Sequence, residues 1–299
     1  MAAVIPAGTA AAPVAAPRGK PGVTPYLLLA PGVLFLVVFF AVPTVQLLAA
    51  SMYDRTGSVE NGYAQTFSLD NFGYAWDLYH EQMLRSFAYS LICTVLCVLL
   101  GYPLAYAIAL KAGRWKHLLL IAVVAPLFTS FLIRTFAWKA ILADTGELVG
   151  LLRAVHLLGP DGRLLATPVA VIAGLVYNFL PFMVLPLYAS LDKLDSRLLE
   201  ASADLAHGPV RTFARVTLPL TMPGIVAGTL LTFVPATGDY VNAQLLGNTR
   251  TTMIGNVIQS RLLVVKDLPV GSALSVVLMA VILVLVLAYL RKTDTDEVV

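Results

Sequence analysis

Uncharged stretches long enough to cross a bilayer recur along the chain. The first runs from Tyr26 to Ala50 without a charged residue, and five more follow it. About 20 apolar residues in a helix, each rising 1.5 Å, span the hydrocarbon of a membrane. The pattern therefore predicts six transmembrane helices. The five later stretches are Ser86–Leu110, Leu118–Ile133 (extended through Trp138 to reach the required length), Pro168–Leu191, Val216–Gly238 and Leu268–Leu290.

The two ends of the chain lie outside this pattern. Residues 1–25 consist mostly of Ala, Pro and Gly with Arg18 and Lys20, a composition that cannot build a core. We expect a disordered tail there, a membrane domain over 26–292 and a short tail at 293–299. The first apolar stretch is longer than the apolar region of a signal peptide, so we expect it to remain as a membrane helix.

The connection between the fourth and fifth stretches, residues 191–219, has a helical pattern of its own. Gly208-Pro209 interrupts the pattern, because Gly ends a helix readily and Pro opens the next one. The segment is therefore predicted to form two short helices that meet at an exposed bend, and we call it the elbow. Its first apolar stripe has three- and four-residue spacing: Leu191, Leu194, Leu198, Ala201 and Leu205.

Lys and Arg divide unequally between the two sides of such a chain. The N-terminal tail, residues 111–116, the elbow and the C-terminus hold eleven of them, against eight in the three longer connections. Positive residues concentrate in cytoplasmic loops, which predicts that both termini and the elbow are cytoplasmic. The outer connections are 51–85, 139–167 with a short amphipathic element, and 239–267 with a short surface helix at 254–258.

Composition supports the membrane assignment. The chain is 59% hydrophobic and 12% charged, whereas soluble domains carry about 25% charged residues. The formal net charge of +3 is spread along the chain, so membrane lipid is the expected surroundings and nucleic acid is not an expected partner. Cys93 and Cys97, four apart in an apolar helix, are expected to be buried packing residues.

The motifs of nucleotide and metal chemistry are missing from the sequence. It has no G-x-x-x-x-G-K-[ST] loop and no H-E-x-x-H, and its four histidines are far apart. An intramembrane aspartyl protease needs two acids at membrane depth, and Asp239 has no such companion. We therefore expect no catalytic residue, no metal site, no cofactor and no ATP hydrolysis in this chain.

Polar residues inside the apolar stretches are the remaining chemical signal, because they are costly in a bilayer and usually face protein or water. Arg134 either extends to the outer interface or faces the bundle. Asp239 either ends its helix at the interface or attracts cations to a pore. Asn178 either joins neighbouring helices through hydrogen bonds or contacts substrate. Pro181 and Pro186 are expected to break the helix that contains it.

The elbow resembles a known motif. Glu200-Ala201-Ser202, then Gly208, then Val216-x-Leu218-Pro219, is similar to the EAA loop of the permease subunits of bacterial ABC importers. Two departures stand out: Ser202 replaces the second Ala, and Ala206 occupies the usual Gly position. The second departure moves the expected bend toward Gly208.

The resemblance covers residues 26–292 and is strongest with the PotB-type permeases of spermidine/putrescine importers. The strings that carry it are Ala125-Pro126-Leu127 with Ile133-Arg134-Thr135, Gly174-Leu175-Val176-Tyr177 with Leu180-Pro181-Phe182-Met183, Leu187 through Leu194, Leu220 through Gly224, and Ile254 through Ile258.

The resemblance implies an all-α, six-helix type I ABC importer permease in the bacterial inner membrane. It also implies partners: a PotC-like second permease, two ABC ATPase subunits that bind the ATP, and an extracytoplasmic substrate-binding protein. Residues implied in coupling to an ATPase are Glu200, Ala201, Ser202, Leu205 and Gly208. Residues expected along a polyamine path are Asp239, Tyr240, Tyr177, Asn178, Phe182 and Trp138.

Two alternatives remain open from the residues alone. One is a self-contained channel or ion-coupled carrier, although such carriers usually hold two related halves and this chain has no internal repeat. The other is an importer permease for a different solute, such as a phosphonate, iron or a sugar.

Overall fold

The computed structural model describes residues 24–159, 161–204 and 208–296, and every regular element in those ranges is helical. The chain divides into two compact units, residues 1–46 and 47–299. α1 (Thr24–Leu36), in the first unit, continues through a π-helical turn into α2 (Val42–Ala50), whose last four residues belong to the second unit. The run Leu27–Ala50 is long and apolar enough to cross a membrane, as predicted, and none of its residues is buried.

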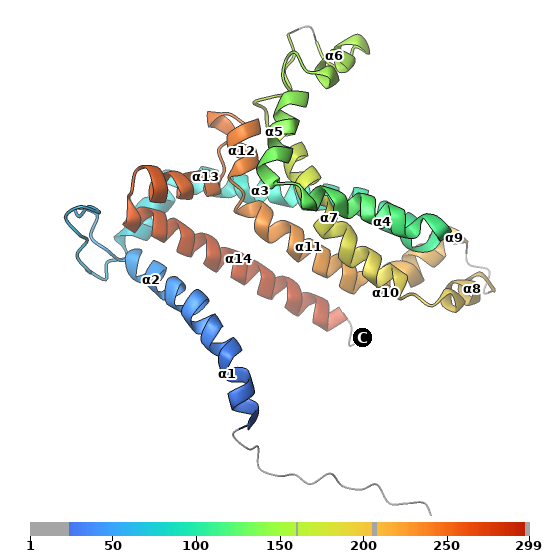
Figure 1. Ribbon diagram of the computed structural model, residues 1–299, viewed down its shortest axis with the longest axis horizontal. Helices are drawn as coiled ribbons and strands as arrows, with labels where there is room; N and C mark the ends of the chain where they lie inside the picture. The colour runs from blue at the N-terminus through green and yellow to red at the C-terminus, as the bar shows by residue number, and fades with distance from the viewer. Residues whose placement is uncertain (1–23, 160, 205–207, 297–299) are drawn as a thin grey trace, which may run out of the picture. The chain divides into compact units, whose positions relative to one another are not determined.

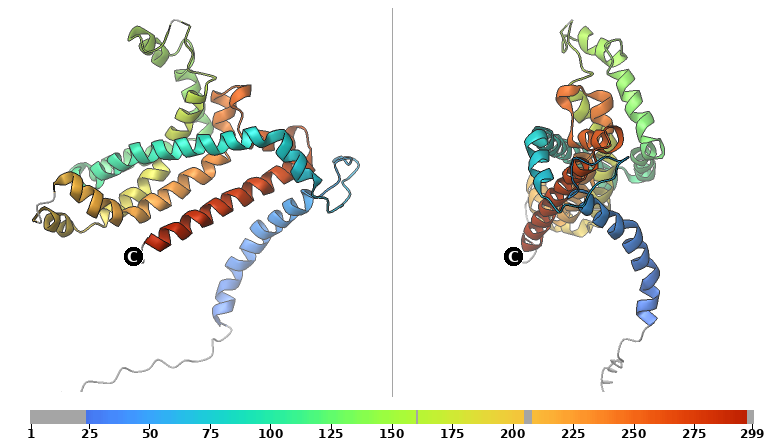
Figure 2. Two further views of the ribbon diagram at one scale, coloured as in Figure 1. Left: turned by 180° about the vertical axis from the view of Figure 1, so that it is seen from behind. Right: turned by 90° about the vertical axis from the view of Figure 1, so that its left-hand side faces the viewer.

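The second unit is built on four long helices (Figures 1 and 2). They are α3 (Asp70–Tyr106, continued by a π-helical turn to Lys111), α7 (Pro168–Asp192), α11 (Met222–Thr237) and α14 (Leu268–Asp296). Its shorter helices are α4 (Lys116–Val124), α5 (Phe131–Ile141), α6 (Glu147–Ala154), α8 (Ser196–Asp204), α9 (Pro209–Thr212), α10 (Leu218–Leu220), α12 (Val241–Leu246) and α13 (Ile254–Gln259).

The described helices fit the predicted number of spans if two bent pairs are counted as spans. Four continuous helices are long and apolar enough to cross a membrane, and the bent pairs raise the number to six. The third predicted span is not one straight helix: Gly113–Phe128 and Phe131–Ile141 meet at 96°. Extended backbone at Thr129 and Ser130 makes this bend, after a 3-10 turn that contains Pro126.

Two other expectations about helices are wrong. Pro181 and Pro186 do not break α7, which is continuous, since neighbouring helices and small local adjustments can accommodate a proline inside a membrane helix. The second predicted span begins well before Ser86, because α3 starts at Asp70 and takes in much of the predicted outer connection. Asn71 near its start is buried and donates from Nδ2 to the backbone oxygens of Ser51 and Tyr53, at 2.9 and 2.8 Å.

The core of the second unit lies where α3, α7 and α11 pack against one another. Cys93 and Cys97 are fully buried in it as free thiols, which confirms their predicted packing role. α7 and α11 approach closely through glycines: a Cβ on Gly224 would lie 2.8 Å from the carbonyl oxygen of Pro186, and one on Gly228 would lie 2.6 Å from Sδ of Met183. Small residues permit such backbone contact between membrane helices.

Hydroxyl groups join α3 to its neighbours. Thr237 Oγ1 at the end of α11 donates to Ser90 Oγ (2.8 Å), and the Ile254 amide that opens α13 donates to Ser86 Oγ (2.7 Å). Ile254 is fully buried and Val257 nearly so, and both pack in a cluster with α3 and α14. The helix expected at 254–258 exists, but its expected place at the surface is wrong.

Substitution of Gly224 tests the close approach of α7 and α11. Gly224→Ala places a methyl group against Pro186 and Ser190, so we expect the free energy of unfolding of the detergent-solubilised chain to fall by about 1–3 kcal/mol. Gly73→Ala is the control, because a Cβ on that exposed residue of α3 meets nothing within 4 Å and the alanine favours the helix. Equal effects of the two substitutions would contradict the packing.

Candidate functional site

The elbow forms two arms beyond the ends of α7 and α11. α8 is the first arm, and α9 with the π-helical turn Phe213–Thr217 and α10 is the second. The two arms contact each other, and in Figures 1 and 2 they lie at the end of the bundle remote from α13. The predicted pair of short helices is thus present, with Pro209 at the first position of α9 as expected.

The expected apolar stripe of the first arm does not belong to one helix. α7 continues to Asp192 and α8 begins only at Ser196, so Leu191 is a fully buried core residue of α7. Leu198 lies in α8 and is 47% exposed. The three- and four-residue spacing of apolar positions therefore continues across the break between α7 and α8. For this reason it did not mark a single helix.

The predicted coupling residues have different environments. Glu200 and Ala201 are exposed on α8, and Gly208 is exposed at the start of the second arm, so all three are open to a partner. Ser202 is only 6% exposed, and its Oγ is 2.9 Å from Oγ1 of Thr212 on the second arm. Its hydroxyl therefore braces the two arms. Leu205 lies outside the described residues.

The base of the elbow is tied to α3 and α4. Phe213 of the second arm meets the ring of Tyr102 edge-on at 5.5 Å between centroids, and Tyr102 Oη hydrogen-bonds Thr221 Oγ1 at 2.8 Å. Lys116 at the start of α4 forms an ion pair with Asp192, the last residue of α7. These contacts connect the elbow and its ends to α3, α4, α7 and α11.

A buried polar relay joins α5, α7 and α12, and it contains two of the predicted path residues. Asn178 Nδ2 donates to Asn242 Oδ1 (3.1 Å) and lies 3.4 Å from Thr135 Oγ1. Asp239 accepts from the Asn242 backbone amide (2.8 Å) and from its Nδ2 (3.2 Å). All four side chains are at most 8% exposed, which places a carboxylate inside the protein beside three elements.

The six predicted path residues do not line one cavity. Trp138 and Tyr177 meet edge-on at 5.4 Å and both face the groove beside α5. Phe182 pairs with the ring of Phe179, and Tyr240 lines an apolar cavity beside α13 and α14. The structure joins only Asn178 and Asp239 in one network, through a residue outside the predicted set, Asn242.

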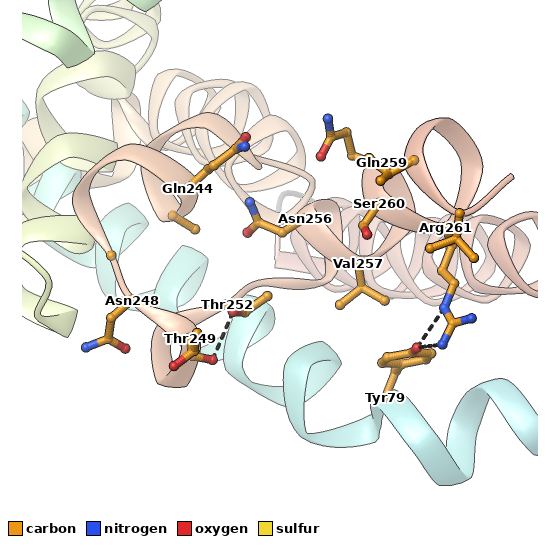
Figure 3. A pocket seen from close by; sticks show the side chains of 14 residues that line it. Tyr79, Gln244, Asn248, Thr249, Thr252, Asn256, Val257, Gln259, Ser260 and Arg261 are labelled. Carbon is orange, nitrogen blue, oxygen red and sulfur yellow. Dashed lines mark hydrogen bonds between the residues drawn. The ribbon is translucent and has the colours of Figure 1, made fainter. Parts of the chain in front are cut away.

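A separate polar cavity of about 680 Å³ lies around α12 and α13. In Figure 1 these helices lie away from the elbow. Figure 3 shows it between the segments 243–265 and α3, with the carboxamides of Gln244 and Asn256 among its lining. Tyr79 of α3 reaches it from below and accepts a 2.8 Å hydrogen bond from Nε of Arg261. The connection 239–267, expected to be an outer loop, thus contributes most of the lining of this cavity.

Arg261 holds one wall of this cavity in place. Its Nη1 forms a 3.1 Å ion pair with Asp267 in addition to its bonds with Tyr79. Burial by itself would lower the pKa of the guanidinium, but the hydrogen bonds to Tyr79 and the nearby Asp267 carboxylate outweigh it and raise the pKa. Because its charge is already matched, Arg261 serves as a fixed support.

Sequence reasoning missed the members of this site that depend on contacts between distant segments. Asn242 follows Asp239 by three residues, so a capping pattern is its only local signal, and nothing local indicates that it meets Asn178. The cavity at 243–265 is rich in amides and hydroxyls, which in the sequence are typical of an ordinary loop.

The described geometry can be compared with known proteins. Residues 98–292 match the family model described as binding-protein-dependent transport system inner membrane component. The spermidine/putrescine transport system permease protein PotB of Haemophilus influenzae is 41% identical over 258 residues, which cover 86% of this chain and 90% of that protein.

Two crystal structures of bacterial alginate ABC transporters share the fold. The first has a TM-score of 0.68 and 19% identity and covers 91% of this chain and 95% of the matched chain. The second, in complex with an alginate pentasaccharide-bound periplasmic protein, has a TM-score of 0.65 and 20% identity and covers 89% and 92%. The predicted all-α ABC importer permease fold is confirmed. The chain belongs to the inner membrane components of binding-protein-dependent transport systems, as a multi-pass permease of the PotB type.

Proposed function

We propose that this chain forms part of the translocation path of an ATP-driven importer of polyamines, paired with a PotC-like second permease. The observation that carries the substrate is the extent of its likeness to a spermidine/putrescine permease, 86% of the chain at 41% identity. ATP hydrolysis belongs to separate subunits of such a transporter. Membership of the family removes the case for a self-contained channel or carrier.

The elbow is proposed as the contact with an ATPase subunit. Its first arm presents Glu200 and Ala201 to solvent, and the Ser202–Thr212 contact supports moving both arms as one body. Movement of an ATPase would then displace the ends of α7 and α11 together, since Gly224 holds these helices in backbone contact. Coupling requires contacts that differ between two states, and a rigid arm provides them.

The relay is proposed as the polar part of the path. Asp239 is the member with a carboxylate, and a polyamine cation favours carboxylates and aromatic faces. Asn242 and Asn178 hold Asp239 against α7, so a swing of α7 and α11 would change its surroundings. Trp138 and Tyr177, paired edge-on, are the proposed aromatic contacts on α5 and α7.

The orientation proposed for the chain places the elbow and both termini in the cytoplasm. The polar cavity at 243–265 then faces the extracytoplasmic side, where a binding protein delivers substrate. Among the described residues, its lining of amides, hydroxyls and the paired guanidinium of Arg261 contains no carboxylate, so it suits contact with another protein surface better than it suits capture of a cation.

Cysteine labelling tests this orientation. Leu151→Cys on α6 and Leu198→Cys on α8 both put a thiol at an exposed position, whereas the native Cys93 and Cys97 are fully buried. In intact spheroplasts a membrane-impermeant maleimide is expected to label the variant at 151, and to label the variant at 198 only after permeabilisation. The reverse pattern would contradict the cytoplasmic elbow.

Glu200→Ala tests the elbow as the coupling contact. In vesicles that carry the assembled complex, we expect ATP-driven uptake of labelled spermidine to fall about tenfold or more, in line with coupling free energies of about 1–3 kcal/mol. The matched control is Glu147→Ala, which removes another exposed glutamate, on α6. Full uptake by the Glu200 variant would remove this residue from the coupling contact.

Asp239→Asn tests the relay as part of the path. The amide keeps the size of the side chain and its acceptor for the Asn242 backbone amide but loses the negative charge. We expect the apparent KM for spermidine to rise about tenfold or more, since hydrogen bonds to charged groups contribute about 1.5–3 kcal/mol, while the yield of complex is unchanged. The control is Asp54→Asn in the outer segment. Unchanged KM, or a loss of complex, would make Asp239 a structural cap of α12.

A further inference from the structure

An open groove of about 530 Å³ lies in the inner corner of the bent pair formed by α4 and α5. Three of its ten lining residues are alanines, with Ala122 and Ala125 on one wall and Ala137 on the other. Tyr177 of α7 closes one side. The charged residue of this lining is Arg134, in the first turn of α5.

Arg134 has a buried guanidinium with unsatisfied donors. The residue is 8% exposed, and its Nε and Nη1 are buried without a hydrogen-bond partner among the described residues. Its charged head lies 5.6 Å from the ring centroid of Phe131, a neighbour on its own helix. The side chain is therefore not extended to an interface, which was one of its two expected positions, and a buried unpaired charge is strongly unfavourable.

The depth of Arg134 follows from its neighbour. Thr135 contacts Asn178, which is the eleventh of the 25 residues of α7 and so lies about 15 Å along that helix. The hydrocarbon of a bilayer is about 30 Å thick, which places this contact near its middle. A phospholipid phosphate resides at the edge of that layer, so a lipid head group does not explain the unmet donors.

The chain itself supplies no acceptor for Arg134 in the described residues. Asp239, the carboxylate at comparable depth, forms no ion pair with Arg134 and accepts instead from the backbone and side-chain amides of Asn242. A polyamine carries the same sign of charge as the guanidinium and cannot pair with it. An acid from another protein chain within the membrane would supply the missing acceptor.

We propose that the α4–α5 groove receives an Asp or Glu side chain from a transmembrane helix of the second permease, which pairs with the guanidinium of Arg134. This inference rests on the proposed function, because it needs the second permease. The alanines of the groove allow a helix backbone to approach closely. The planar fork of the guanidinium matches a carboxylate through two parallel hydrogen bonds.

Photo-crosslinking of the assembled complex, with Arg134 intact, identifies the occupant. A photoreactive phenylalanine analogue replaces either Ile133, which lines the groove, or Leu132, which does not; these residues are 62% and 50% exposed. We expect the probe at 133, and not at 132, to crosslink a membrane-spanning peptide of the second permease that contains an acid. Crosslinks at 133 to lipid alone or to this chain would overturn the proposal.

Arg134→Leu gives a second test, because it is expected to weaken the complex without destabilising the isolated chain. Loss of a purely structural residue would destabilise both. In the isolated chain the substitution removes an unpaired charge, so we expect the melting temperature to rise or stay unchanged. In the complex it leaves the acid of the partner unpaired, so we expect co-purification of the second permease to fall about tenfold or more. Arg134→Lys should restore part of the loss, and Lys139→Leu, at an exposed position of α5, should cause none.

The outcomes separate this inference from the function on which it rests. If the unmodified chain binds its second permease and the Arg134→Leu complex is equally stable, the ion pair is wrong and the proposed function stands. If the unmodified chain co-purifies with no second permease, both are wrong. Replacement of the crosslinked acid by Arg, combined with Arg134→Glu, is expected to recover assembly, and failure of that exchange would also contradict the pair.

Discussion

The contact between α7 and α11 is the constraint on which the other features depend. Gly224 and Gly228 bring α11 so close to α7 that a single Cβ would collide with Pro186 or Met183. The elbow connects the ends of these same two helices, and α12 follows α11 directly. In the proposed function, a displacement of the elbow would reach the buried relay through these packed backbones. In a membrane this matters because helix association depends on close packing, as lipid is itself apolar.

Polar side chains at membrane depth divide into a satisfied and an unsatisfied group. Asp239 is held by Asn242, and Nδ2 of Asn178 ties that pair to α7, so the carboxylate has its hydrogen-bond donors within one chain, although Oδ1 of Asn178 has no partner among the described residues. Arg134, one residue from the Asn178 contact on Thr135, is buried with donors unmet. The contrast has a physical meaning: a charge that the subunit leaves uncompensated is a charge that assembly with another subunit can satisfy.

The number of spans and the elbow could be predicted from the sequence because both are signals along the chain. Length without charge marks a span, and Gly208-Pro209 marks a bend, whatever the rest of the protein does. Element limits were less predictable. Charged residues before Ser86 concealed the first turns of α3, and the prolines of α7 predicted a break that tertiary contacts prevent. The family resemblance could also be recognised from the sequence, because its motifs are short continuous strings of residues.

The composition and order of apolar and polar residues by themselves determined that the chain crosses a membrane repeatedly and bears a polar elbow, since a long apolar helix satisfies its own backbone hydrogen bonds and is stable in lipid. Only the tertiary structure decided which polar residues meet. Asn178 and Asn242 are 64 positions apart, and Ser86 and Ile254 are 168 apart. Such pairs depend on how helices bend and cross. The 96° bend before α5 is not marked by any change in the spacing of apolar residues along the chain. Contact between distant segments depends on how the helices pack. Packing brought Asn178, Asn242 and Asp239 into one network and formed the groove between α4 and α5.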